Sequence, residues 1–280
     1  MTDPLTSLAA LDGVAEAVDE ARGACERLRW HPALRRRTAE CRVESGVRAA
    51  RCSAALEGGR LPLELVRDAA RGAAELPSDG AGLVVRGALR AHAEAERLAD
   101  AGGRSLAAAP WQALARLHVA AAAGLVDADA LGRPRLAGEP PRDVPEGALA
   151  PDGAELAARL EALGGLLSTP TAAPVLVLAA VAHAEVMTLR PFVAGNGLVA
   201  RALAHALVVG RGLDPTGVAV PEAAHLSDAN GYAAALAGYA SGSRDGVAAW
   251  VRHCGWAVVA GAGEGTVVAD AVLAGRLPAA

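Results

Sequence analysis

Two glycines flank an asparagine in the segment Gly195-Asn196-Gly197, and Arg201 follows one helical turn later. Glycine and asparagine tolerate left-handed backbone angles, so the segment predicts a tight turn. Pro191 does not continue the helix expected before this turn, and a new helix is expected from about Gly197. The first N–H groups of that helix lack partners within it and lie at the positive end of its dipole. Together with the fixed charge of Arg201, they predict a binding site for a phosphate group.

A simpler interpretation of the same residues is a turn between two helices, in which the glycines serve only the backbone. Short glycine motifs often occur without any ligand, so Gly195, Asn196 and Gly197 alone do not decide between the two interpretations. The residues around the turn are therefore the more useful guide to its role.

The full segment 189–201 reads LRPFVAGNGLVAR. It resembles the signature of the Fic (Fido) family, His-Pro-Phe-x-Asp/Glu-Gly-Asn-Gly-Arg-x-x-Arg. Pro191, Phe192 and Arg201 match this signature, as does the glycine-flanked asparagine. Phe192 is the only phenylalanine in the chain. The resemblance implies that its ring packs under the loop and holds the loop to the core.

Three positions of the signature carry different residues here. The resemblance implies an enzyme that moves AMP from ATP to a hydroxyl of a protein target, with the signature histidine as the base. Arg190 stands at that position, and a guanidinium stays protonated in proteins. Leu198 replaces the first arginine of the signature, which removes one phosphate-binding charge. Because losing a positioned base alone slows a reaction about 10²–10⁴-fold, we expect AMP transfer to be impaired or lost.

Ala194 replaces the acidic residue that would hold Mg²⁺ on the phosphates. It offers no side-chain oxygen to a hard cation, so the sequence does not favour Mg²⁺, whereas ATP binding remains compatible with the loop. Arg190 could partly substitute for the metal as a cation beside the phosphates.

A second match lies far upstream, where Ser53 and Glu57 precede Gly58. This segment resembles the inhibitory helix of Fic proteins that regulate themselves, Ser/Thr-x-x-x-Glu-Gly/Asn. The resemblance implies that Glu57 pairs with Arg201 and occupies the space that the γ-phosphate of a nucleotide would need.

Two further residues have both a functional and a structural interpretation. His183 lies seven residues before Arg190, which places both on one helix face, and we expect a packed, hydrogen-bonded histidine there. Tyr232 resembles the family tyrosine that lines the adenine pocket. The alternative is a half-buried tyrosine whose hydroxyl group has a hydrogen-bond partner.

Composition favours an all-α protein. Hydrophobic residues make up 52% of the chain, mostly Ala, Leu and Val, aromatic residues make up 2%, and isoleucine is absent. Ala and Leu are strong helix formers, whereas strands favour β-branched and aromatic residues. The net charge of −4 argues against a dedicated nucleic-acid-binding protein.

The cysteines predict a cytoplasmic protein with reduced, buried thiols, because Cys25, Cys41, Cys52 and Cys254 show no CxxC spacing. No membrane association is expected. The longest apolar run, residues 172–182, is too short to span a bilayer, and the N-terminus lacks the order of a signal peptide.

Helical patterns divide the chain into an N-terminal helical region (residues 1–105), a Fic-like core (106–262) and a C-terminal tail (263–280). Residues 133–150 are rich in proline and glycine and predict a long loop or a short hairpin, where the family would dock its protein target. Helices are expected at 5–57 with a break at 30–32, and at 61–74, 80–101, 111–125, 155–167, 174–189, 197–209, 229–239 and 246–259.

Three functions are consistent with these features. The first is a nucleotide-binding or structural pseudoenzyme with a Fic fold that acts through protein contacts. The second is an active Fic-type transferase with an altered mechanism or phosphate donor. The third is a non-enzymatic helical interaction protein. The protein target is unidentified, and a homodimer is left open, since helical N-terminal regions of the family often dimerise.

Overall fold

The computed structural model describes residues 3–100, 104–144 and 150–276, and these residues form an all-α fold, as the composition predicts. Within them no strand is present, and an isolated bridge joins Ala123 to Val126. The N-terminal half contains α1 (Pro4–Ala9), α2 (Val14–Arg29), the 3-10 helix η1 (Pro32–Arg35), α3 (Thr38–Leu56), α4 (Leu63–Ala70) and α5 (Gly80–Asp100).

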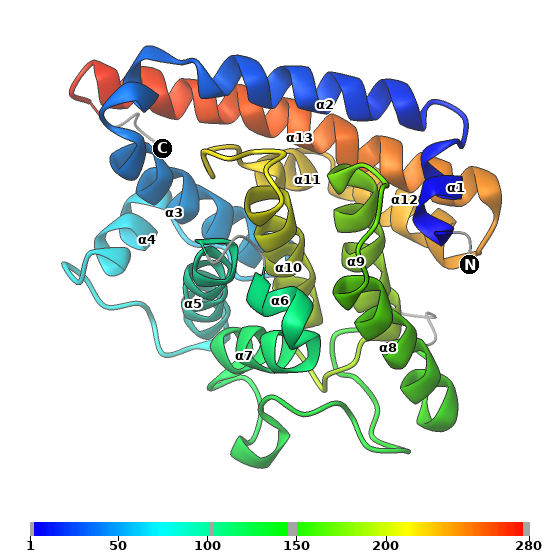
Figure 1. Ribbon diagram of the computed structural model, residues 1–280. Helices are drawn as coiled ribbons and strands as arrows, with labels where there is room; N and C mark the ends of the chain where they lie inside the picture. The colour runs from blue at the N-terminus through cyan, green and yellow to red at the C-terminus, as the bar shows by residue number, and fades with distance from the viewer. Residues whose placement is uncertain (1–2, 101–103, 145–149, 277–280) are drawn as a thin grey trace.

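The second half contains α6 (Arg104–Ala108), α7 (Pro110–Ala122), η2 (Ala128–Ala130), α8 (Gly153–Ser168), α9 (Val175–Leu189), α10 (Asn196–Gly210), α11 (Pro221–Ser227), α12 (Ala229–Ala240) and α13 (Arg244–Leu273). Helices α9 and α10 form the centre of the molecule (Figure 1). Both are apolar around most of their circumference, as expected for helices buried on all sides. Helix α5 packs against α10, and α3 packs against α5.

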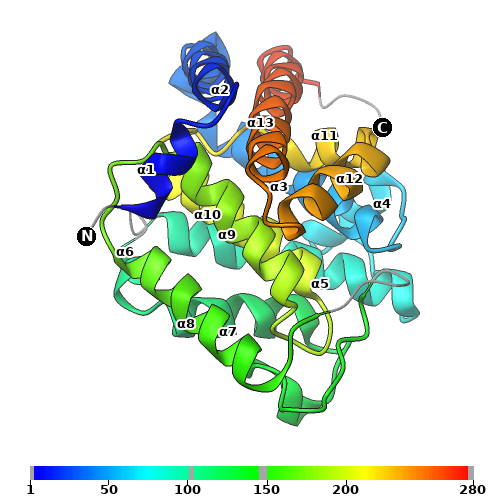
Figure 2. The ribbon, with the colours of Figure 1, turned by 90° about the vertical axis from the view of Figure 1, so that its right-hand side faces the viewer.

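Helices α2 and α13 lie side by side and together cover one end of this core, at the top of Figures 1 and 2. By length and composition alone, α13 could cross a membrane, since an 18-residue window in it has a mean hydropathy of 1.3. In this structure it packs against α2, α11 and α12 and contributes Trp250, Val251 and Val258 to the main hydrophobic core. These contacts make α13 a core helix of the fold.

Several boundaries differ from the sequence predictions. The C-terminal tail expected from residue 263 begins later, because α13 continues to Leu273 and buries Val268 and Val272 against α2 and η1. Helix α11 was not predicted, since its seven residues are too few to show a helical period. The four cysteines are buried free thiols, as expected.

The segment expected as a long loop or short hairpin at 133–150 is a loop in its described part, residues 133–144, and residues 145–149 lie outside the described chain. Two backbone hydrogen bonds join this segment to the loop between α9 and α10. The Arg135 N–H donates to the Pro191 carbonyl at 2.7 Å, and the Arg142 N–H donates to the Val193 carbonyl at 2.7 Å. The segment therefore lies directly along the motif loop, which comprises residues 190–195 between α9 and α10.

Glycine permits a close approach where α13 crosses the start of α11. A Cβ atom at Gly261 would lie 2.6 Å from the backbone nitrogen of Pro221, and the Gly261 carbonyl accepts a hydrogen bond from the Val220 N–H at 3.0 Å. Gly263, two residues further along α13, is exposed and has open space around its Cβ position.

This pair of glycines gives a matched test of the packing. Gly261→Ala is expected to lower the free energy of unfolding by about 1–3 kcal/mol, because backbone atoms cannot move aside cheaply. Gly263→Ala is expected to raise it by about 0.5–1 kcal/mol through helix propensity. Urea denaturation of both variants measures the two effects, and equal responses would contradict the packing described here.

Candidate functional site: an anion site at the start of α10

Helix α9 ends in a turn at Arg190, which has a φ of 46° and is the one non-glycine residue with positive φ in the described chain. The left-handed conformation is unfavourable for a residue with a Cβ, so other contacts must stabilise it. Arg135 supplies them from the neighbouring loop. Its buried guanidinium donates to the Arg190 carbonyl at 2.7 Å and to the Leu189 carbonyl at 3.4 Å. Arg135 was not identified from the sequence.

Asn196 fixes the shape of the loop that follows. Its side-chain oxygen accepts from the Phe192 N–H at 2.9 Å, and its side-chain nitrogen donates to the Phe192 carbonyl at 2.8 Å. The asparagine is fully buried, and Gly195 before it adopts a φ of 81°. The predicted tight turn is therefore present, held by the Asn196 side chain across four residues.

Phe192 packs beneath the loop, as the resemblance implied, and its partner is His118 of α7. The two rings stack with centroids 3.9 Å apart. His118 Nδ1 accepts from the Gly132 N–H at 2.9 Å, so Nε2 carries the proton that it shares with the Ala194 carbonyl at 3.2 Å. Burial lowers the pKa of His118 to about 4, which keeps the ring neutral.

Asp143 binds at the N-terminus of α10, where the sequence predicts a phosphate. Its carboxylate accepts hydrogen bonds from the Asn196 backbone N–H at 2.9 Å and from the Asn196 side-chain nitrogen at 2.9 Å. Asp143 belongs to the proline-rich loop, outside the motif, and was not identified from the sequence. The donors predicted for an anion thus hold a carboxylate of the same chain.

Arg190, at the position of the family histidine, also turns toward Asp143. Its Nη1 donates to the Asp143 backbone carbonyl and lies 3.4 Å from Asp143 Oδ1. The arginine is 7% exposed. Arg190 therefore acts as a buried cation for Asp143, and a group with this partner and charge cannot accept a proton.

The second half of the site surrounds Arg201, which is 2% exposed. Its Nη2 lies 2.7 Å from Glu57 Oε1, and its Nε donates to Ser53 Oγ at 2.8 Å. Burial alone would lower the pKa of Arg201, but the charges and hydrogen bonds of Glu57 and Tyr232 together outweigh burial and raise it. The structure thus brings together the three residues that the resemblance connects, from α3 and α10.

Gly197 allows Glu57 to reach the start of α10, because a Cβ atom at this position would collide with the Glu57 carboxylate. The carboxylate of Glu57 therefore lies over the first turn of the helix, beside Arg201, while Asp143 caps the same turn through Asn196. Two acidic side chains from different parts of the chain share the positive end of one helix.

Tyr232 lies deeper in the protein and is 5% exposed. Its hydroxyl oxygen accepts from Arg201 Nη1 at 3.4 Å and lies 2.8 Å from His183 Nε2. Burial lowers the pKa of His183 to about 3 and raises that of Tyr232 to about 12, so both are neutral. The Tyr232 ring packs against His225, with centroids 4.6 Å apart. An adenine ring would have to displace such neighbours to stack on Tyr232.

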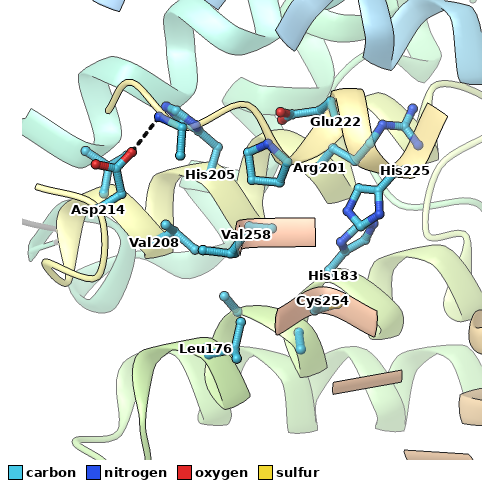
Figure 3. Close-up of a pocket in the computed structure, with 16 residues that line it drawn as sticks. Leu176, His183, Arg201, His205, Val208, Asp214, Glu222, His225, Cys254 and Val258 are labelled. Atoms are coloured by element: carbon cyan, nitrogen blue, oxygen red, sulfur yellow. Dashed lines mark hydrogen bonds between the residues drawn. The ribbon is translucent and has the colours of Figure 1, made fainter. Parts of the chain in front are cut away.

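A small cavity lies behind Arg201, between α9, α10, α11 and α13 (Figure 3). Its volume is about 40 Å³, enough for one or two water molecules and too small for a nucleobase. Glu222 lines the cavity, its Oε2 has no hydrogen-bond partner among the described residues, and burial raises the pKa of this carboxyl. The cavity adds no nucleotide pocket to the anion site.

The residues of the loop do not fit Mg²⁺ in this arrangement. Ala194 has no side-chain oxygen, and its carbonyl is taken by His118. The carboxylate of Asp143, which lies beside the loop, faces N–H donors of Asn196 and the guanidinium of Arg190. A hard cation would need that carboxylate to leave all of these donors.

The fold agrees with solved structures of Fic proteins. A Fic family protein from Desulfovibrio desulfuricans aligns with a TM-score of 0.68 and 20% identity, over 99% of this chain and 77% of that one. A Fic domain-containing signalling protein from Bacteroides thetaiotaomicron aligns with a TM-score of 0.69 and 16% identity, over 94% and 99% of the two chains. Fic-1 (residues 134–508) from C. elegans gives a TM-score of 0.66 and 17% identity, over 94% and 73%.

These alignments establish an all-α fold of the Fic type. By sequence, residues 104–208 match the model of the Fic/DOC family, while no curated protein matches the chain. Residues 104–208 are thus similar in sequence to the Fic/DOC family, and the fold that surrounds them is of the Fic type. The matched range contains the motif loop and the proline-rich loop with Asp143, whereas Ser53, Glu57 and Tyr232 lie outside it.

Because His118 is held neutral beneath the loop, we predict that the free energy of unfolding depends on pH. The unfolded chain binds a proton at His118 with an ordinary pKa near 6.5, whereas the folded chain does so only near pH 4. Stability from this group is therefore present at pH 7 and is lost as the pH falls from about 6.5 to 4. The His118 contribution to the loss between pH 7 and pH 5 is about 2 kcal/mol.

Urea titrations of the wild type and His118→Gln at both pH values measure this effect. The variant is expected to be less stable at pH 7 and to lose about 2 kcal/mol less on acidification. An unchanged pH dependence in the variant would show that His118 is not held neutral.

Proposed function

We propose that this protein binds the phosphate groups of a nucleotide at the N-terminus of α10 and does not transfer AMP. One observation carries the proposal: the donors expected for phosphates are in place, and they hold two carboxylates of the chain itself. Asn196 binds Asp143, and Arg201 binds Glu57. A phosphate presents the same kind of acceptor oxygens to such donors.

The arrangement around Arg190 supports the absence of transfer. A base must lie within hydrogen-bond reach of the hydroxyl that it deprotonates, and the residue at this position is a cation bound to Asp143. Leu198, at the position of a phosphate-binding arginine, is 2% exposed and belongs to the hydrophobic core. Leucine at this position therefore offers no charge to a phosphate and instead packs in the hydrophobic core.

Glu57 and Asp143 give the proposed site a closed form. Glu57 lies where the γ-phosphate is expected, and Asp143 lies closer to the motif loop, at the backbone of Asn196. A nucleotide must displace both carboxylates to use these donors. We therefore expect weak binding in the wild type and autoinhibition by two independent contacts.

Nucleotide titration calorimetry with the wild type and four variants tests this proposal. Glu57→Gly and Asp143→Ala are each expected to raise ATP affinity about 10-fold, the equivalent of about 1.4 kcal/mol, and the double variant to raise it further. Glu75→Gly, at an exposed loop position after α4, is the matched control. Binding that no variant improves would favour the non-enzymatic interaction protein instead.

The alternative of an active transferase with an altered mechanism is supported by one feature, the carboxylate of Asp143 beside Arg190. A carboxylate can act as a general base or hold a metal ion, so Asp143 could supply what the motif lacks. In that case Asp143 binds Asn196 only when no nucleotide is present and leaves it during the reaction.

Incubation with radiolabelled ATP and a cell lysate distinguishes the two functions. Our proposal predicts that Glu57→Gly shows no label transfer above background, with or without Mg²⁺. Transfer by Glu57→Gly that disappears in Glu57→Gly/Asp143→Asn would instead establish an Asp143-dependent transferase. Arg190→Ala in the Glu57→Gly background reports whether the arginine binds the phosphates, through the change in ATP affinity.

A further inference from the structure

A cluster of metal-ligating side chains lies between α5 and α10. His92 and Glu96 are one turn apart on α5, and His205 comes from α10. The nearest ligand atoms of the three residues lie within 4.8 Å of one another. Neither the motif nor the inhibitory segment includes any of these residues.

The carboxylate of Glu96 lies between the two imidazoles. Its Oε1 is hydrogen-bonded to His205 Nε2 and lies 3.8 Å from His92 Nε2, and the two rings have centroids 4.5 Å apart. Its other oxygen, Oε2, lies 2.5 Å from Nε of Arg42 on α3. Arg42 therefore orients the carboxylate from outside and leaves Oε1 directed at the histidines.

We propose that His92, Glu96 and His205 form a binding site for a divalent transition-metal ion, with Zn²⁺ as the expected ion. Two imidazole nitrogens and one carboxylate oxygen are a donor set that Zn²⁺ accepts, with water in the fourth position. Tetrahedral ligands at zinc distances lie about 3.3 Å apart, so small side-chain rotations bring these atoms into place. The pairing of Arg42 with Glu96 supplies the outer contact that metal ligands usually have.

Space and access support this site. A Cβ atom at Gly46 of α3 would lie 2.7 Å from His92 Nε2, so only glycine leaves room for the ring in its present position. His92 and Glu96, together with Arg42, also line a surface depression of about 670 Å³ between α3 and α5. An ion can therefore reach the open side of the cluster from solvent.

The site is separate from the anion site but shares a helix with it. His205 follows Arg201 by one helical turn on α10, whereas His92 and Glu96 belong to α5. A bound ion would join α5 to α10 and add to their packing. We therefore expect a structural role, in which metal binding raises the midpoint of thermal unfolding.

Titration of the metal-free full-length protein with Zn²⁺, and separately with Co²⁺, tests the proposal. The expected result is one ion per chain with a dissociation constant of about 10 µM or tighter. Saturating Zn²⁺ is expected to raise the unfolding midpoint by about 5 °C. Cobalt should give the visible absorption of a tetrahedral nitrogen–oxygen site, without the intense near-ultraviolet band that a cysteine thiolate would add.

His92→Ala/His205→Gln is expected to weaken binding at least 100-fold, and His31→Ala, which removes a histidine paired with Asp270 at the surface, is expected to leave it unchanged. If the double variant does not fold, Glu96→Gln replaces it, with an expected loss of about 10–100-fold. No saturable binding in the wild type, or binding that these variants do not weaken, would overturn the proposal.

Discussion

Positive charge inside a protein needs a negative partner close by, and the start of α10 gathers several positive groups in one place. Arg201 is almost fully buried, Arg190 is nearly so, and the first N–H groups of the helix point toward the same loop. An unpaired charge at such a site costs several kcal/mol. Glu57 and Asp143 supply the negative charges that pair with these groups. Glu57 directly follows α3 and Asp143 belongs to the proline-rich loop, so the pairing holds both segments beside the start of α10.

This constraint accounts for the form of the loop, although positions 190, 194 and 198 differ from the Fic signature. Four residues of the motif build the turn. Asn196 binds the backbone of Phe192, and the Phe192 ring stacks on His118. Gly195 supplies the positive φ, and Gly197 leaves room for Glu57. The changed positions now serve packing or charge pairing: Leu198 enters the core, and Arg190 binds Asp143. These contacts leave the hydrogen-bond donors of the turn facing negatively charged groups.

The sequence predicts those features that depend on short-range patterns. Helical composition gives the fold class, and the turn at Asn196 follows from residue types within a few positions, whereas the packing of Phe192 under the loop was implied by the resemblance to the Fic family. The contact of Glu57 with Arg201 was accessible only through the resemblance to a family, since 144 residues separate them. Asp143 and Arg135 lie in a loop without periodicity, so no local pattern indicates where their side chains point. The position of His118 was indicated only weakly by the sequence: it lies among the apolar residues Leu114 and Leu117 of α7, which suggests burial but not its contact with Phe192.

The central claim is that the chain's own carboxylates occupy the phosphate positions of a preserved anion site. A crystal structure of Glu57→Gly/Asp143→Ala with a non-hydrolysable ATP analogue tests it most directly. We predict phosphate oxygens within hydrogen-bond distance of the Asn196 N–H and the Arg201 guanidinium, on an unchanged loop. Phosphates bound elsewhere, or a loop that collapses without the two carboxylates, would contradict the account.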